Sequence, residues 1–160
     1  MKRLWAPWRM NYVSGARAPA GCIFCTAPAA GDDRGQLVLH RGRHGYLILN
    51  AYPYAAGHLL AVVYRHIAGV AEATSDELTD LMRLVTMATT LLADEYRAEG
   101  FNVGLNQGRV AGAGIADHLH MHIVPRWSGD ANFVAVVGET RVIPEALDVT
   151  YDRLKSRLRD

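Results

Sequence analysis

The chain has 160 residues, which fits one compact domain, and half of them are hydrophobic, enough for a sizeable core. Lys and Arg number 17 against 16 Asp and Glu, a net charge of +1, whereas a general nucleic-acid binder would show a strong basic excess. No apolar run approaches the roughly 20 residues that span a bilayer, and residues 1–8 lack the apolar stretch of a signal peptide. We therefore expect a cytoplasmic protein that binds neither nucleic acid nor membrane, with room for a small anionic ligand.

Residues 1–35 are rich in Pro, Gly and Ala, and we expect an irregular N-terminal segment there. Its aromatic residues Trp5, Trp8 and Tyr12 predict docking on a surface, such as that of a partner subunit.

Both cysteines, Cys22 and Cys25, lie in this segment with the C-x-x-C spacing. In a reducing compartment this spacing indicates a metal site or a redox pair rather than a structural disulfide. A redox pair would open a helix after a strand. Because Pro and Gly surround this pair as in a loop, a metal site is the favoured interpretation.

Extended segments come next. Residues 37–40 and 46–49 flank a Gly-containing connection and predict a hairpin, and 58–64 predict a third strand. The following segment, 74–99, predicts a long helix. It begins with the capping-box pair Thr74 and Glu77. Apolar residues then recur at helical spacing, and Gly100 is expected to end the helix.

The last predicted strands are 101–106 and 119–124, joined by a glycine-rich loop, and Pro125 is expected to limit the second. A shorter helix is predicted over 144–158, with Pro144 in its first turn. Hairpin-linked strands with interposed helices predict an α+β fold with an antiparallel sheet.

The strongest functional signal is the alternation of His118, His120 and His122 with apolar residues. On a strand, the period of two places all three imidazoles on one face. Such a row is either a metal cage or a nucleophile with its supporting groups. Asn106 and the glycines that follow offer an amide and backbone N–H groups just before the row, which favours phosphate chemistry.

The pattern N-x-G-x-x-A-G, from Asn106 to Gly112, followed by H-φ-H-φ-H resembles the histidine-triad family of nucleotide hydrolases and transferases, and the likeness covers about 36–127. Residues 4–9 and 129–133 resemble a bacterial branch often linked to diadenosine tetraphosphate cleavage. The resemblance implies a single domain: an irregular segment (1–35), a core (36–127) with a five-stranded antiparallel sheet and a long packed helix, and an extension (128–160) with a C-terminal helix. It also implies a homodimer, with the Trp-rich N-terminus and the C-terminal helix as candidate contacts.

The resemblance further implies a role for each histidine of the triad. His120 attacks the α-phosphorus, the carbonyl of His118 orients it, and His122 contacts a phosphate oxygen or the leaving group. The implied nucleotide-binding residues are Asn50, His58, Asn106, Gly112, Ala113 and Gly114. Asn50 would contact the ribose, whereas His58 is either a wall of the site or a turn-capping residue. Many relatives have Gln-Ser or Gln-Thr where this chain has Ala113-Gly114, so which N–H groups bind the phosphate stays open.

Some members of the family bind zinc through a C-x-x-C pair, a His after the third strand and the first His of the triad. Here that set is Cys22, Cys25, His66 and His118, a donor set that suits a closed tetrahedral structural Zn²⁺. The alternative is two free thiols in a loop. No organic cofactor is implied.

The implied activity is cleavage of dinucleoside polyphosphates, with an adenine nucleotide as substrate and a nucleotidyl-histidine intermediate. With water as the acceptor the enzyme is a hydrolase, which His122 favours; with inorganic phosphate it is a phosphorylase, which the flanking motifs favour. Phosphoramidase activity and a regulatory nucleotide-binding protein remain alternatives. Four arginines are either contacts for the distal phosphates or solvated surface residues: Arg9, Arg65, Arg109 and Arg126.

Overall fold

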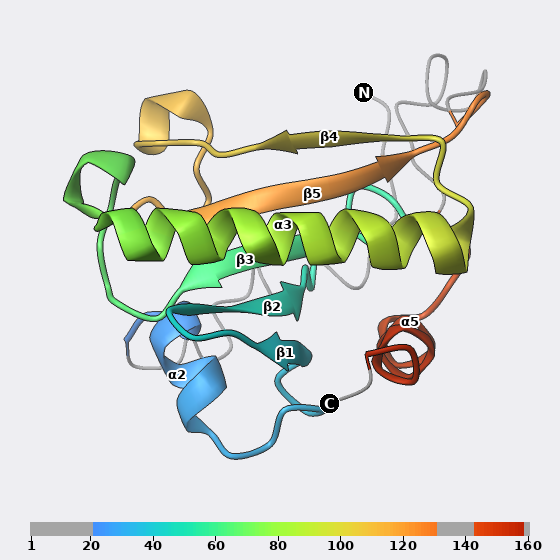
Figure 1. Cartoon of the computed structure of the whole chain (residues 1–160), viewed down its shortest axis with the longest axis horizontal. Helices are drawn as coiled ribbons and strands as arrows, with labels where there is room; N and C mark the ends of the chain where they lie inside the picture. The colour runs from blue at the N-terminus through green and yellow to red at the C-terminus, as the bar shows by residue number, and fades with distance from the viewer. Residues whose placement is uncertain (1–20, 131–142, 159–160) are drawn as a thin grey trace, which may run out of the picture.

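The computed structural model describes residues 21–130 and 143–158 (Figure 1). The predicted N-terminal contacts Trp5, Trp8 and Tyr12, together with Arg9, lie outside these residues. In chain order the elements are α2 (Ile23–Ala29), β1 (Val38–Arg41), β2 (Gly45–Leu49), β3 (Leu59–Val63), α3 (Ser75–Tyr96), β4 (Gly100–Gly104), β5 (His120–Arg126) and α5 (Leu147–Lys155), with short 3₁₀ turns at Val70–Glu72 and Arg109–Ala111.

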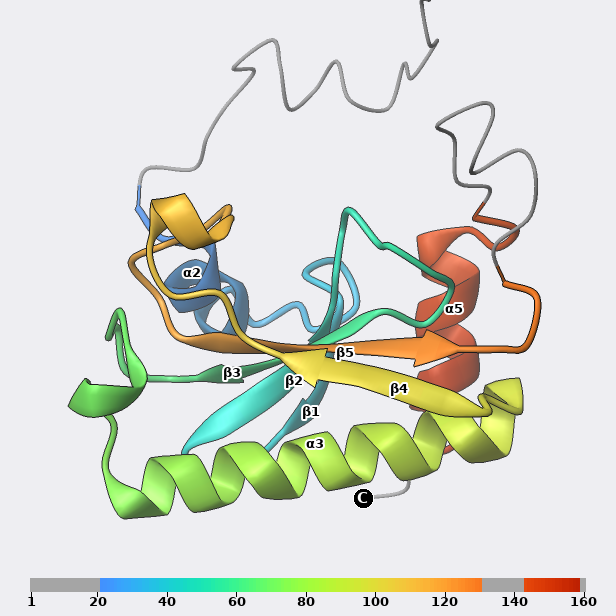
Figure 2. The same ribbon diagram turned by 90° about the horizontal axis from the view of Figure 1, so that it is seen from above.

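The five strands form one antiparallel sheet in the order β1-β2-β3-β5-β4. Helix α3 lies across one face of the sheet, and α2 and the loops after β2 and β4 lie on the other (Figure 2). Helix α5 adds Tyr151 and Leu154 to the core on the α3 side. The prediction of an α+β fold with a five-stranded antiparallel sheet, a long packed helix and a C-terminal helix is confirmed.

The two faces of the sheet bury separate clusters because side chains alternate along each strand. On β5 and the residue before it, Leu119, Met121 and Ile123 pack on the α3 side, as do Ala61 and Val63 of β3. The cluster on the other face consists of Phe24, Ala27, Val38, Tyr46, Ile48, Leu60 and Val62. The histidines of β5 therefore project to the face that carries α2.

Helix α3 begins as predicted. The Thr74 hydroxyl accepts the N–H of Glu77, and the Glu77 carboxylate accepts the N–H of Thr74. Its predicted end at Gly100 is wrong: the helix stops at Tyr96, and Arg97 takes the left-handed conformation (φ 53°) that closes it. Gly100 instead opens β4.

Helix α2 replaces the irregular structure predicted around the cysteines. Cys22 is its N-cap residue and Cys25 lies in its first turn. Pro28 is tolerated near its end, where it lacks the N–H that would bond to the Phe24 carbonyl. The hydroxyl of Tyr46 donates to that carbonyl instead, over 2.6 Å, and so fastens α2 to β2.

Two predictions about prolines are also wrong. Strand β5 continues through Pro125 to Arg126, since Pro125 lies beyond the last β3 pair, where β5 has a neighbour on one side only. Helix α5 starts at Leu147 after the N-cap residue Ala146, so Pro144 precedes its first turn.

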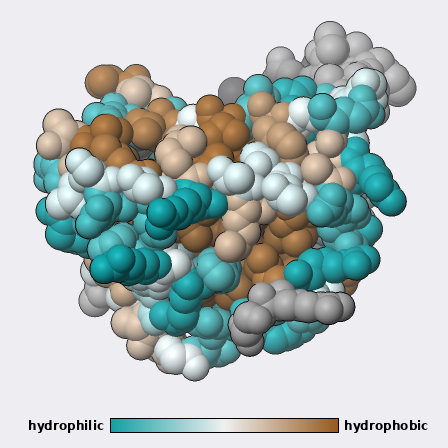
Figure 3. Space-filling view, viewed as in Figure 1, coloured by the Kyte–Doolittle hydropathy of each residue, from teal (hydrophilic) through white to brown (hydrophobic). Residues whose placement is uncertain are grey.

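None of the described helices is long and apolar enough to cross a membrane. The α3 side of the surface mixes hydrophilic and hydrophobic residues (Figure 3). Met82 of α3 is half-exposed.

Candidate active site and metal centre

The three imidazoles of the triad form a row on the α2 face of the sheet. The rings of His120 and His122 lie 5.1 Å apart, and Phe24 contacts the rings of both His118 and His120. His118 and His120 are buried, whereas His122 is partly exposed. The row therefore leads from the interior to the surface.

His120 is held in the form of a nucleophile. Its Nδ1–H donates to the His118 carbonyl over 2.7 Å, which leaves the lone pair of Nε2 free. Burial lowers the pKa of His120 below its ordinary value. The ring is therefore neutral at neutral pH, as nucleophilic attack requires.

His58 and His122 form a second hydrogen-bonded pair. The Tyr54 N–H donates to His58 Nδ1 over 3.1 Å, so the proton of neutral His58 lies on Nε2. His58 Nε2 is 3.0 Å from His122 Nδ1 and donates to it, which leaves His122 with its own proton on Nε2. Burial, aided by His122, lowers the pKa of His58 to about 3, and burial, aided by His120, lowers that of His122 to about 4. His122 thus offers an N–H donor beside the nucleophile.

The loop between β2 and β3 surrounds this pair. The Tyr54 ring stacks on His122 at 5.9 Å and contacts His58 at 4.6 Å. The side chain of Asn50 accepts the Tyr52 N–H and lies 3.3 Å from His58 Nδ1. His58 is fully buried and contacts both His122 and, as a turn-capping residue would, the Tyr54 N–H. Its part in nucleotide binding and the ribose contact of Asn50 stay predictions. No motif in the sequence pointed to Tyr54.

The glycine-rich loop projects on the same side of the sheet as α2 (Figure 2). Gly108 (φ 82°) and Gly112 (φ 86°) both have positive φ angles, which glycine adopts most easily. Asn106 and Gly114 are exposed and Ala113 is partly exposed, but Gln107 is engaged, since its Oε1 accepts the Val70 N–H. Between the described parts of this loop and His120 there is no hydrogen bond, so phosphate binding by this loop stays a prediction.

Two of the arginines proposed for the distal phosphates are paired elsewhere. Arg65 binds the Glu77 carboxylate with two nitrogens, and Arg126 binds Asp130 and Asn102. Arg109 is exposed within the glycine-rich loop.

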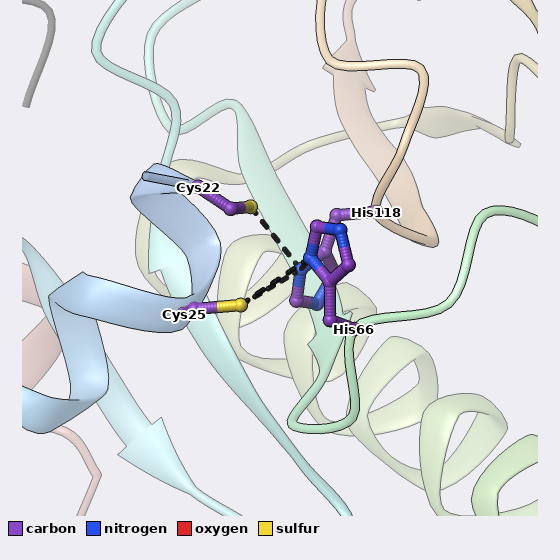
Figure 4. A group of neighbouring side chains, drawn as sticks. All are labelled: Cys22, Cys25, His66 and His118. Carbon is purple, nitrogen blue, oxygen red and sulfur yellow. Dashed lines mark hydrogen bonds between the residues drawn. The ribbon is translucent and has the colours of Figure 1, made fainter. Parts of the chain in front are cut away.

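A second cluster adjoins the triad at His118 (Figure 4). Cys22 and Cys25 extend from α2, and His66 follows β3. The Cys22 Sγ is 3.3 Å from His118 Nδ1, the Cys25 Sγ is 3.4 Å from His66 Nδ1, and the two Nδ1 atoms are 3.3 Å apart. All four ligand atoms lie within 4.8 Å of one another.

Four of the six distances between these ligand atoms, 3.3 to 3.5 Å, suit a tetrahedral metal ion. Zinc–sulfur and zinc–nitrogen bonds of the usual lengths put neighbouring ligand atoms about 3.3 to 3.8 Å apart. The Nε2–H of His118 donates to the Val63 carbonyl over 2.8 Å, which leaves Nδ1 as the metal-binding lone pair. The structure thus brings together all four residues that the sequence suggested as ligands.

Comparisons with known proteins identify similar sequences. The model of the HIT domain family matches residues 34–129. AP-4-A phosphorylase of Mycobacterium tuberculosis is 43% identical over 155 residues, which cover 92% of this chain and 79% of that protein. The asymmetrical bis(5'-nucleosyl)-tetraphosphatase of Schizosaccharomyces pombe is 30% identical over 96 residues, 60% of this chain and 52% of that one.

Solved structures share the fold. A hypothetical histidine triad nucleotide-binding protein from Sulfolobus tokodaii has a TM-score of 0.65 at 26% identity, covering 84% of this chain and 90% of that one. A zinc-bound histidine triad family protein from Mycobacterium smegmatis has a TM-score of 0.68 at 20% identity, with 85% and 91% covered. With a family match over more than half its length, this chain belongs to the HIT domain family.

Proposed function

We propose that the chain cleaves dinucleoside polyphosphates such as diadenosine tetraphosphate at the α-phosphate, through a nucleotidyl-His120 intermediate. An enzymatic role in the hydrolase and phosphorylase group of this family follows from the 43% identity to AP-4-A phosphorylase. The observation that carries the mechanism is the hydrogen bond from His120 Nδ1–H to the His118 carbonyl, which directs the free Nε2 lone pair away from the backbone.

In the first step His120 Nε2 attacks the α-phosphorus. A P–N bond forms, the bond from phosphorus to the bridging oxygen breaks, and the rest of the polyphosphate leaves with the bonding electrons. His122 Nε2–H donates a hydrogen bond to the oxygen that gains charge. In the second step the acceptor oxygen attacks the same phosphorus and the P–N bond returns its electrons to His120.

We propose inorganic phosphate as the acceptor, which makes the enzyme a phosphorylase. The support is the identity to AP-4-A phosphorylase over most of the chain. His122, which favoured a hydrolase, is equally able to assist either acceptor because its N–H faces the leaving group in the first step. Hydrolysis remains the second candidate, as the relative from Schizosaccharomyces pombe is a tetraphosphatase.

The test is product analysis with diadenosine tetraphosphate, with and without inorganic phosphate. A phosphorylase yields ADP and ATP, and only when inorganic phosphate is present. A hydrolase yields AMP and ATP in both conditions. His120→Asn should abolish both reactions and the nucleotidyl-protein intermediate. His40→Asn, on β1, should leave the reactions and the intermediate unchanged. If the wild type forms no product, the substrate assignment is wrong and a phosphoramidase or a regulatory binding protein takes its place.

We further propose that Cys22, Cys25, His66 and His118 bind a structural Zn²⁺, with no part in bond cleavage. When bound, the ion would join α2, the segment after β3 and the segment before β5. The purified protein should contain about one zinc per chain, and Cys22→Ala should lose it. Metal kept at full occupancy in Cys22→Ala would point instead to a cage formed by the triad.

A homodimer and a cytoplasmic location complete the proposal. The edge strand β4 supports a dimer, because β5 is its sole neighbour among the described strands and an open edge can pair with another chain. Helix α5, which packs on its own β1 and α3, and the Trp-rich N-terminus stay the other candidate contacts. Light scattering after gel filtration would give twice the chain mass for a dimer.

A further inference from the structure

Phe24 lies between the two cysteines of α2, yet its ring contacts the triad. Its centroid is 4.8 Å from that of His120, at an interplanar angle of 47°, and 5.5 Å from that of His118, edge to face. The three side chains are almost fully buried, with 3% of Phe24, 1% of His118 and 6% of His120 exposed. An aromatic side chain from the N-terminal segment is thus packed against the proposed nucleophile.

Several contacts hold Phe24 in this position. Cys22 and Cys25, on either side of it in the sequence, approach His118 and His66. The Phe24 carbonyl accepts the hydroxyl of Tyr46, and its ring belongs to the buried cluster of that face. Because α2 has seven residues, too few to be stable alone, these contacts determine where the ring lies.

The hydrogen bond to the His118 carbonyl does not by itself fix the ring of His120. A single bond from Nδ1 sets the direction of that N–H, but the ring can still rock about it, and rocking moves Nε2 sideways. Van der Waals contact is what restricts such movement in a packed interior. The described rings in contact with His120 are Phe24, at 4.8 Å, and His122, at 5.1 Å. His122 is partly exposed, so Phe24 is the firmer of the two supports.

We propose that Phe24 is a positioning residue for His120: the Cys22–Cys25 segment seats its ring against the imidazole and limits the directions in which Nε2 can point. The proposal rests on the proposed function in one respect, since His120 must be the nucleophile for its orientation to matter to turnover. It assigns α2 a second role, because the segment that carries two metal ligands also orients the reacting atom.

The test compares Phe24→Leu and Phe24→Ala with Val38→Ala. Val38 belongs to the same buried cluster, but β2 and β3 separate its strand from β5, so this control measures the general effect of lost packing. We expect kcat to fall roughly 10-fold in Phe24→Leu and up to roughly 100-fold in Phe24→Ala, because small misplacements of reacting groups have effects of this size. KM should change less than threefold. Val38→Ala should keep the wild-type kcat.

Proton NMR gives a readout that needs no turnover. The ring protons of His120, assigned by their loss in His120→Asn, should shift in both Phe24 variants as the ring current of Phe24 disappears, and its Nδ1–H should exchange faster with water. Zinc content is measured in each variant, and it should equal that of the wild type, so that metal loss does not account for the effect.

The outcomes separate this proposal from the proposed function. Wild-type kcat in both Phe24 variants, or an equal loss in Val38→Ala, would overturn the positioning role while leaving the activity in place. A wild-type protein without turnover would remove the proposed function, and unchanged NMR signals and exchange of His120 in the variants would then also remove the role of Phe24.

Discussion

At the scale of single residues, four histidines of the site each have their proton placed by a neighbour. The Val63 carbonyl accepts a hydrogen bond from His118 Nε2–H, and the His118 carbonyl accepts one from His120 Nδ1–H. The Tyr54 N–H donates to His58 Nδ1, so the proton of His58 lies on Nε2. As a result His118 has a lone pair for a metal, His120 has one for phosphorus, and His122 has an N–H for the leaving group. One residue type thus serves three purposes within one row.

The role of His58 can be tested by its replacement. In His58→Phe, His122 loses the donor at Nδ1 and its neutral ring can carry the proton on either nitrogen, so we expect kcat to fall about 10-fold. His58→Gln, whose amide can still donate to Nδ1, should recover most of this loss. Nitrogen NMR of His122 would show Nε2–H in the wild type and a mixture of tautomers in His58→Phe. A single unchanged tautomer in that variant would contradict the assignment.

The buried, neutral His58 also makes stability depend on pH. Its pKa is about 3 in the folded protein, against an ordinary value of 6.5, so between these values the unfolded chain binds a proton that the folded chain lacks. The free energy of unfolding is therefore highest above pH 6.5 and falls as the pH drops towards 3. Urea unfolding at pH 6, 5 and 4 should show a slope about 1.4 kcal/mol per pH unit smaller in His58→Phe than in the wild type. Equal slopes would mean that His58 is not kept neutral.

At the scale of elements, sequence patterns predicted the helices and strands whose apolar pattern repeats over many residues. They missed the short elements that are stabilised by contacts with distant parts of the chain. Helix α3 has 22 residues with an apolar stripe and a capping box, and the sheet strands alternate or are continuously apolar. Helix α2 has seven residues and contains Pro28, so local pattern favoured a loop; the Tyr46 hydroxyl and the packing of Phe24 stabilise it as a helix. For the same reason the contacts of Phe24 and Tyr54 with the triad had no signal in the sequence.

The start of α3 provides a prediction at this scale. Hydrogen bonds from Arg65 and Thr74 lower the pKa of Glu77 to about 2, against an ordinary 4.5. A lowered carboxyl pKa adds stability above pH 4.5 that is lost as the pH falls towards 2. Glu77→Gln should therefore lower the free energy of unfolding by about 1 kcal/mol at pH 7, and by progressively less below pH 4.5.

The control is Asp76→Asn, which removes an exposed charge from the same first turn. Its effect should be smaller at pH 7, because Asp76 takes no part in the capping box. If both variants lose the same stability at every pH, the charge of the first turn rather than the Glu77 hydrogen bonds is responsible.

At the scale of the whole molecule, the metal cluster joins three segments that are far apart in the sequence. It connects α2 with the residue three positions after β3 and with the residue two positions before β5, all on the face opposite α3. The larger cluster between the sheet and α3 contains none of the four ligands. Loss of the metal should therefore loosen the face of the sheet that carries the triad and leave the other face folded.

Removal of zinc by a chelator would test this division. At a free zinc concentration a hundredfold above Kd, bound metal adds roughly 3 kcal/mol to stability, so its removal should lower Tm by about 5 to 10 °C. Far-ultraviolet circular dichroism should stay close to that of the zinc-loaded protein, because α3 and the sheet keep their core. Turnover should fall, since both the His118 carbonyl and Phe24 act on His120, and added Zn²⁺ should restore both Tm and turnover. An unchanged Tm after the zinc has been removed would show that the four residues hold α2 in place without a metal, through their packing alone.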